Sequence, residues 1–229
     1  FGGDEGGIAI RKRTDIFQQN ETLIAFDFNL LTQDAPSGKI TDPHSRIYGA
    51  DNLYVSEGVD ARAVIINAED GPIYLGKNVT LSEGAIIKGT HGFCNNSFVA
   101  MGGKMRGGST IGPYAKAGGE VSNSVIMGYS NKAHEGYMGN SVLGYWCNLG
   151  AGTNTSNLKN NYTEVKSWSY VSGSITGVGA DFCGLVMGDH SKCGIDTMLN
   201  SGTVIGVSAN VFGGGYQPKF IPSFSWGGE

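Results

Sequence analysis

LGKNVT-LSEGAI-IKGTHG-FCNNSF-VAMGGK-MRGGST-IGPYAK is the stretch Leu75–Lys116 written in blocks of six, and it decides the fold. The first position of every block is apolar: Leu75, Leu81, Ile87, Phe93, Val99, Met105 and Ile111. The fifth position is small in nearly every block, and the pattern returns from Met187 as MGDHSK-CGIDTM-LNSGTV-IGVSAN. An α-helix repeats its apolar stripe about every 3.6 residues, so a period of six argues against helices here.

A period of six is typical of a short strand followed by a tight corner. Three such faces make one triangular coil, and coils then stack at the strand spacing of about 4.8 Å. Each coil buries its apolar residues only against its neighbours, as in a solenoid. We therefore predict an all-β, parallel β-helix. The alternatives are a right-handed β-helix, whose coils are longer and less regular, and a glycine-rich β-sandwich, for which alternation with a period of two is weak.

Composition narrows the classes of function. Glycine accounts for 38 of 229 residues, charged residues for 16%, and the formal net charge is −4. Nucleic-acid-binding domains carry a basic stripe, whereas the one basic cluster here, Arg11–Arg13, reads as a solvated turn. No apolar run is long enough to cross a bilayer. We therefore expect neither a nucleic-acid partner nor a membrane span.

The cysteines argue against a metal site or a disulfide framework. Cys94, Cys147, Cys183 and Cys193 form no C-x-x-C pair, and their spacing matches neither arrangement. We expect reduced thiols in a cytoplasmic protein, with no metal in this chain.

Three segments fall outside the repeat. Residues 1–45 do not follow the six-residue period. They are expected to be a cap or the remnant of an upstream domain, with a short helix and a strand within 15–31. The β-helix is predicted over 46–213, with a loop excursion at 154–179. The tail, 214–229, is expected to run back over the last coil or onto a neighbouring chain.

The hexapeptide repeat resembles the left-handed parallel β-helix of acyltransferases and related sugar-nucleotide enzymes. A second stretch, 131–157, resembles more specifically the acetyltransferase half of the bifunctional enzymes that make UDP-N-acetylglucosamine. The matching residues keep the family spacing without a gap: Ala133, His134, Tyr137, Gly139, Asn140, the run NLGAGT from Asn148 to Thr153, and Asn157. The resemblance implies a homotrimer that uses acetyl-CoA and an amino-sugar phosphate.

The resemblance also implies roles for individual residues. His134 is similar to the general base that takes a proton from the attacking amine, and Glu120 to the carboxylate that orients it. The implied sugar-phosphate contacts are Tyr137 and Asn148, with Lys132 as a further candidate, and the implied CoA contacts are Ala151, Asn157 and Gly213. The chemistry is consistent, because an imidazole with a pKa near 6.5 accepts a proton at neutral pH.

The chain departs from the family at several positions. Ser122 stands where the family has a lysine, Ile195 where it has a serine, and Gly213 where it has an alanine. The family arginine about thirty residues before the histidine has no clean match. The residues that could replace these basic contacts are Lys104, Arg106, Lys116 and Lys132.

Three hypotheses of function follow. The first is a CoA-dependent N-acyltransferase that acetylates an amino-sugar-1-phosphate in sugar-nucleotide biosynthesis. The second is the β-helix half of a sugar-1-phosphate uridylyl- or thymidylyltransferase whose catalytic domain lies upstream. The third is a trimerising or regulatory module without activity of its own. The acyl group, the sugar and the nucleotide are left open.

Overall fold

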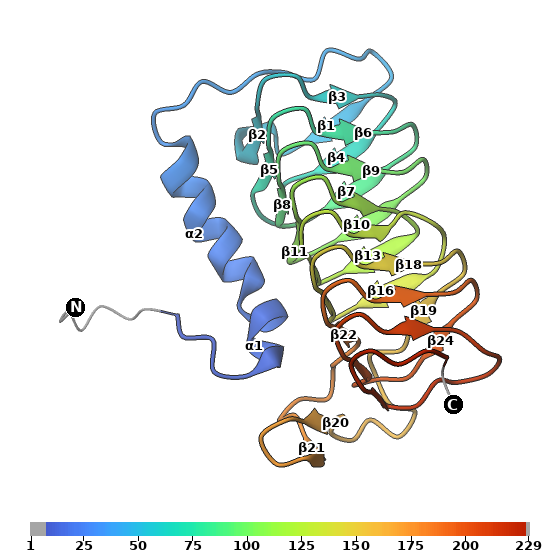
Figure 1. Cartoon of the computed structure of the whole chain (residues 1–229). Coiled ribbons are helices and arrows are strands. Elements are labelled where there is room, and N and C mark those ends of the chain that lie inside the picture. Colours follow the sequence, from blue (N-terminus) through green and yellow to red (C-terminus); the bar gives the residue numbers. More distant parts are fainter. Residues whose placement is uncertain (1–7, 228–229) are drawn as a thin grey trace.

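The structure is a computed structural model that describes residues 8–227. Two helices, α1 (Arg13–Gln18) and α2 (Asn20–Thr32), precede a tall column of short stacked strands (Figure 1). A short 3-10 helix, Ala50–Asn52, lies in the first coil. Strands within the column pair in parallel, which confirms the predicted parallel β-helix.

Three sheets form the faces of the column. The first sheet contains β1 (Arg46–Tyr48), β4 (Ile65–Asn67), β7 (Ile86–Lys88), β10 (Lys104–Arg106), β13 (Glu120–Ser122) and β16 (Tyr137–Gly139). The second contains β2 (Leu53–Val55), β5 (Ile73–Leu75), β8 (His91–Phe93), β11 (Ser109–Ile111), β14 (Val125–Ile126), β17 (Val142–Leu143), β22 (Val186–Met187), β25 (Val204–Ile205) and β27 (Phe220–Ile221). The third contains β3 (Asp60–Ala61), β6 (Thr80–Leu81), β9 (Phe98–Val99), β12 (Lys116–Ala117), β15 (Asn131–Lys132), β18 (Asn148–Leu149), β23 (Lys192–Cys193) and β26 (Asn210–Val211). β19 (Asn154–Thr155) contacts β16 and pairs with β24 (Met198–Leu199).

Coil length varies along the column. Asn78 and Asn96 hold equivalent places 18 residues apart, as the repeat predicts. The spacing falls to 15 residues between Ser109 and Ser124. It is 17 residues between Ser124 and Ser141. Every predicted first-position residue from Leu75 to Ile111 is 0% exposed, so the apolar column of the repeat lies on the axis.

A column of aromatic rings runs along the corner between the second and third sheets. Tyr114, Tyr129, Trp146 and His190 stack there in nearly parallel planes, with ring centroids 5.1, 4.5 and 6.2 Å apart. All four have a left-handed backbone, with φ between 58° and 61°. That conformation costs a residue with a Cβ roughly 1–2 kcal/mol. Each stacked pair contributes about 0.5–1.5 kcal/mol, which offsets much of this strain.

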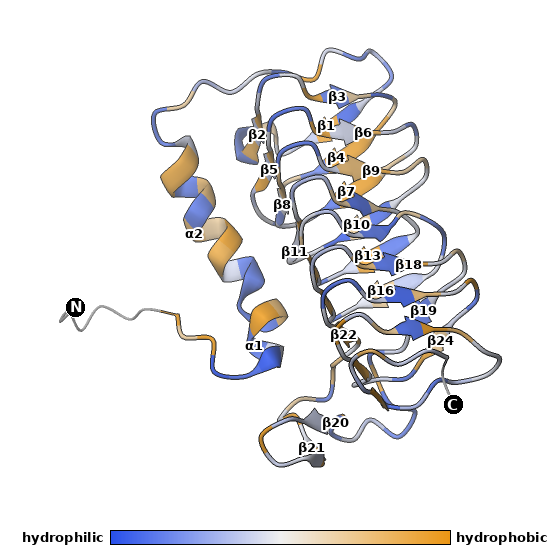
Figure 2. Cartoon of the chain, viewed as in Figure 1, coloured by the Kyte–Doolittle hydropathy of each residue, from blue (hydrophilic) through white to orange (hydrophobic). Residues whose placement is uncertain are grey.

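The N-terminal segment forms two helices where the sequence predicted a helix and a strand. α2 packs on β8 and β11 of the second sheet. Asn20 Nδ2 donates to the carbonyl of Gly108 (2.6 Å), and Thr110 Oγ1 donates to Asn20 Oδ1 (2.9 Å). Helix α2 extends through the segment where the strand was expected and leaves Phe26 and Leu30 exposed. Figure 2 shows apolar segments along α2.

An excursion leaves the column after β19 and returns before β22. It contains an antiparallel hairpin of β20 (Lys166–Ser169) and β21 (Ser174–Gly177). Phe17 of α1 packs with Val142, Val165 and Cys183 in a second apolar cluster. This cluster ties α1 to the column and to the base of the excursion.

The tail adds a strand to the end of the column, against the last coil of the repeat. β27 pairs in parallel with β25, and Ile221 is 3% exposed at the end of the axis.

The four cysteines are free thiols. No helix within residues 8–227 is both long and apolar enough to cross a bilayer.

Ile86 and Ile87 give a direct test of the axial core, because they are neighbours on β7 with 42% and 0% exposure. Ile87→Ala leaves a cavity between coils, so we expect the free energy of unfolding to fall by about 2–5 kcal/mol. Ile86→Ala is the matched control and is expected to cost below about 1 kcal/mol. Urea unfolding followed by circular dichroism measures both. Equal losses would contradict the inward placement of Ile87.

Candidate active site

His134 lies at the corner between β15 of the third sheet and β16 of the first sheet, and it is exposed there. Ala151 occupies the same corner one coil later, where Gly152 N–H donates to the carbonyl of Glu135 (3.1 Å). Gly136 has φ +126°, and a Cβ at this position would approach the Thr153 carbonyl oxygen to 2.1 Å. A glycine is therefore needed where the chain turns beside His134.

Two of the three predicted CoA contacts, Ala151 and Gly213, lie at the same corner on coils that follow. His134, Ala151, Ile195 and Gly213 each come two residues after the inward residue of a third-sheet strand, on consecutive coils. With a strand spacing of about 4.8 Å, this series extends about 14 Å along the axis. Met101 and Ile195 are also exposed at this corner, 73% and 74%. The same two-residue offset in the repeat could have identified Met101 from the sequence.

A hydrogen-bonded group lies on the first sheet next to this corner. Asn157 Nδ2 donates to the Tyr137 hydroxyl (3.0 Å) and to Asn140 Oδ1 (2.7 Å). Burial raises the pKa of Tyr137, and the hydrogen bond from Asn157 opposes this only in part, so the phenol is protonated at neutral pH. The structure thus joins three residues of the predicted motif in one network.

Glu120 lies directly opposite Tyr137 in the register of the first sheet. Its Oε1 accepts from Arg106 Nη1 at 2.7 Å. Among the described residues, no hydrogen bond joins Glu120 to the His134 imidazole, so the proposed orienting carboxylate is engaged by an arginine in this structure.

The structure separates the four candidate basic residues. Lys104 and Arg106 are both on β10 of the first sheet, the face that carries Glu120 and Tyr137. Lys116 is on β12 of the third sheet. Only Lys104 and Arg106 therefore share a face with the Tyr137 network.

Lys132 is buried inside the column. It occupies an inward position of the repeat, opposite Ala117, and is 2% exposed. Its Nζ donates to the carbonyls of His134 (2.6 Å) and Gly118 (3.2 Å). Burial lowers the pKa of Lys132 to about 8, against the opposing charge of Glu135. The predicted substrate contact is thus a buried cation beneath the His134 corner, because the side chain follows the inward alternation of its strand.

Asn148 and Gly213 lie away from the Tyr137 network. Asn148 is on β18 of the third sheet, where its Oδ1 accepts from Asn131 Nδ2 (2.9 Å). Gly213 follows β26 near the end of the column, with φ +133°, and its carbonyl accepts from Gln217 Nε2 (3.3 Å). Within one chain, His134 at the corner separates Asn148 on one face from Tyr137 on the next.

Several known proteins are similar to this chain in sequence. No family model matches the chain. A bifunctional protein GlmU from Synechococcus elongatus is 26% identical over 185 residues, which is 80% of this chain and 35% of that protein. A bifunctional sugar-1-phosphate nucleotidylyltransferase/acetyltransferase from Sulfurisphaera tokodaii is 37% identical over 95 residues, 42% of this chain and 23% of that protein.

Bifunctional GlmU proteins are homologues of this chain. This confirms the predicted resemblance. The chain spans 35% of the length of the Synechococcus elongatus relative. Among solved structures, AntD, an N-acyltransferase from Bacillus cereus in complex with dTDP and 3-hydroxybutyryl-CoA, is 11% identical with a TM-score of 0.28, over 80% of this chain and 76% of that one.

The buried Lys132 predicts a distinct dependence of stability on pH. Burial disfavours the charged amine, so the pKa of Lys132 is about 8 in the folded state against 10.5 in the unfolded chain. Between these values the unfolded chain binds more protons, so the free energy of unfolding should rise with pH, by up to about 3 kcal/mol.

Lys132→Met should lack this rise. Lys116→Met, on the preceding strand of the same sheet with an exposed side chain, is the matched control and should retain it. Urea unfolding at several pH values from 7 to 10.5 measures the effect. Parallel curves for the wild type and Lys132→Met would show that the amine is not buried.

Proposed function

We propose that the chain is a CoA-dependent N-acyltransferase that acetylates the amine of an amino-sugar phosphate. The observation that carries this proposal is the placement of His134 and Ala151 on adjacent coils at one corner, beside the Tyr137–Asn157–Asn140 network. The name of the Sulfurisphaera tokodaii relative includes an acetyltransferase, which supports the same reaction.

In the proposed reaction, His134 is the general base. The substrate ammonium first loses one proton to solvent. The amine then attacks the thioester carbonyl, and the His134 imidazole accepts a second proton from the attacking nitrogen. The tetrahedral intermediate then collapses, the C–S bond breaks, and the proton held by His134 passes to the leaving thiolate. The products are the amide and free CoA.

The developing oxyanion needs a hydrogen-bond donor. The N–H groups of Gly150 and Gly152 are engaged with the carbonyls of Cys193 and Glu135. The N–H of Ala151, between them, has no partner among the described residues. We therefore assign the Ala151 N–H to the oxyanion, where an aligned donor typically contributes about 3–4 kcal/mol to transition-state stabilisation.

The first sheet is proposed to hold the sugar phosphate. The Arg106 side chain is 65% exposed while it pairs with Glu120, so it retains further N–H donors for phosphate oxygens. Lys104 on the same strand would add a second positive charge. The Tyr137 hydroxyl would supply a neutral hydrogen bond.

A homotrimer completes the proposal. Asn148 lies on the third sheet, and Tyr137 lies on the first. In a homotrimer, a face of one column would meet the His134 corner of another. An Asn148 side chain and a Tyr137 side chain would then contact the same ligand. The exposed apolar side chains of Met101, Ile195 and Phe212 at this corner support such a contact. The proposal retains the cytoplasmic setting expected from the sequence.

The names and lengths of the relatives favour a second possibility. The Sulfurisphaera tokodaii relative is also named a sugar-1-phosphate nucleotidylyltransferase, and the matched region is 23% of its length. The chain would then be the β-helix part of a larger nucleotidyltransferase, with a trimerising or regulatory role. Absence of acetyl transfer together with a stable trimer would favour this alternative.

The test is a thiol-release assay with acetyl-CoA and glucosamine-1-phosphate. His134→Ala should lower kcat/KM by roughly 100- to 10,000-fold, because it removes the base. His44→Ala, an exposed histidine in the lead-in before β1, is the matched control and should leave the rate unchanged. Sedimentation should show the same assembly for both variants. Unchanged turnover in His134→Ala would overturn the proposed role.

A further inference from the structure

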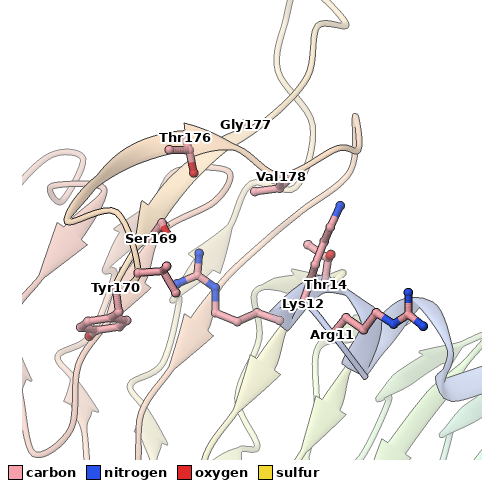
Figure 3. Close-up of a pocket in the computed structure, with 10 residues that line it drawn as sticks. Arg11, Lys12, Thr14, Ser169, Tyr170, Thr176, Gly177 and Val178 are labelled. Carbon is pink, nitrogen blue, oxygen red and sulfur yellow. The ribbon is translucent and has the colours of Figure 1, made fainter. Parts of the chain in front are cut away.

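A cavity lies between the start of α1 and the hairpin β20–β21, away from the candidate active site (Figure 3). Its volume is about 390 Å³. None of the residues of the candidate active site lines it. The hairpin and α1 are joined by the second apolar cluster, which includes Phe17 and Val165, so both walls rest on packed structure.

One wall of the cavity is basic. Arg11, Lys12 and Arg13 line it in succession. Arg13 is half-buried, and its Nη2 donates to Ser167 Oγ at 3.2 Å, which holds the guanidinium against the hairpin. Burial is the main influence on the pKa of Arg13 and lowers it. The positive charge of Arg13 is therefore disfavoured unless an anion compensates it.

Two carboxylates that are near these segments in sequence accept backbone N–H groups. Asp15 Oδ2 accepts the backbone N–H groups of Arg11 (2.7 Å) and Lys12 (2.8 Å). Glu164 Oε1 accepts from the backbone N–H of Gly179 (2.6 Å). Among residues 8–227, no carboxylate lines the cavity and no ion pair involves these three cations. The described lining therefore carries an excess of positive charge.

The facing wall offers hydroxyl groups. Ser169 and Thr176 line the cavity from the two strands of the hairpin, and Figure 3 shows Lys12 extending from α1 on the opposite side. Ser167, which binds Arg13, pairs with Thr176 across the hairpin, so these residues share one face of it. Tyr170 adds an aromatic ring at the rim.

We propose that this cavity binds the phosphate group of a phosphorylated small molecule. Lys12 and Arg13 supply charge-assisted hydrogen bonds to the phosphate oxygens, and the hydroxyls of Ser169 and Thr176 supply neutral ones. Cations that flank a concave, hydroxyl-lined space suit a compact dianion better than a carboxylate or a neutral sugar, because a phosphate presents three strong acceptor oxygens. The site is separate from the proposed acetyl transfer and does not depend on it.

Isothermal titration of the full chain tests this. The probes are inorganic phosphate, glucosamine-1-phosphate, CoA and 3′-dephospho-CoA, each at low and at physiological salt. Lys12→Gln and Thr176→Val should each weaken binding by at least about tenfold, which is about 1.4 kcal/mol. Arg13→Gln should weaken it further, with circular dichroism to check that the helices persist. Lys166→Gln is the matched control, because Lys166 is an exposed cation on the same hairpin outside the cavity lining.

The probes separate the possible sources of the phosphate. A loss of affinity from CoA to 3′-dephospho-CoA identifies the 3′-phosphate as the group bound, whereas equal binding of inorganic phosphate and glucosamine-1-phosphate identifies a general phosphate site. Both results support the proposal when Lys12→Gln weakens the same binding. Binding of none of the probes at millimolar concentration would overturn it. So would an equal effect of Lys166→Gln, which would indicate attraction by surface charge alone.

Discussion

Each coil of the column buries its aliphatic side chains only against the coils on either side, because no single coil has enough apolar surface for a core of its own. The inward residues from Leu75 to Ile111 are fully buried in this way. Parallel pairing on all three faces then satisfies the backbone of each short strand. The positions of the corners, and of every side chain displayed there, depend on this stacking.

The candidate active site lies where the stacking is irregular. The coil length is 18 residues earlier in the column. In the region that carries Glu120 and His134 it is 15 residues and then 17. In the same region a lysine, Lys132, takes an inward position and binds the carbonyls of Gly118 and His134. A buried cation destabilises a fold unless it is compensated. Its presence under one corner is consistent with a site that departs from the regular repeat, as functional sites often do.

The excursion connects the candidate active site to the basic cavity beside α1. It begins near Asn157, whose side chain binds Tyr137, and returns at Cys183, whose N–H donates to the Asn157 carbonyl at 2.9 Å. Between these two points it forms the hairpin that faces Arg13. A segment that interrupts the repeat therefore closes one edge of the Tyr137 network and builds one wall of a separate basic cavity.

The period of six by itself determined the strands and the parallel column, because it requires a strand and a corner at fixed intervals. It also determined the inward side chains, because the apolar residues must face one another. The motif around His134 also identified Tyr137 and Asn157, which the structure joins. The sequence could not show that Lys132 is internal, since a lysine is ordinarily expected at the surface and only the register with Ala117 places it on the axis. Nor could it show that Glu120 pairs with Arg106, or that Arg11–Arg13 faces a hairpin some 150 residues away. Those contacts depend on coil lengths and on tertiary packing of α1, which local sequence pattern does not encode.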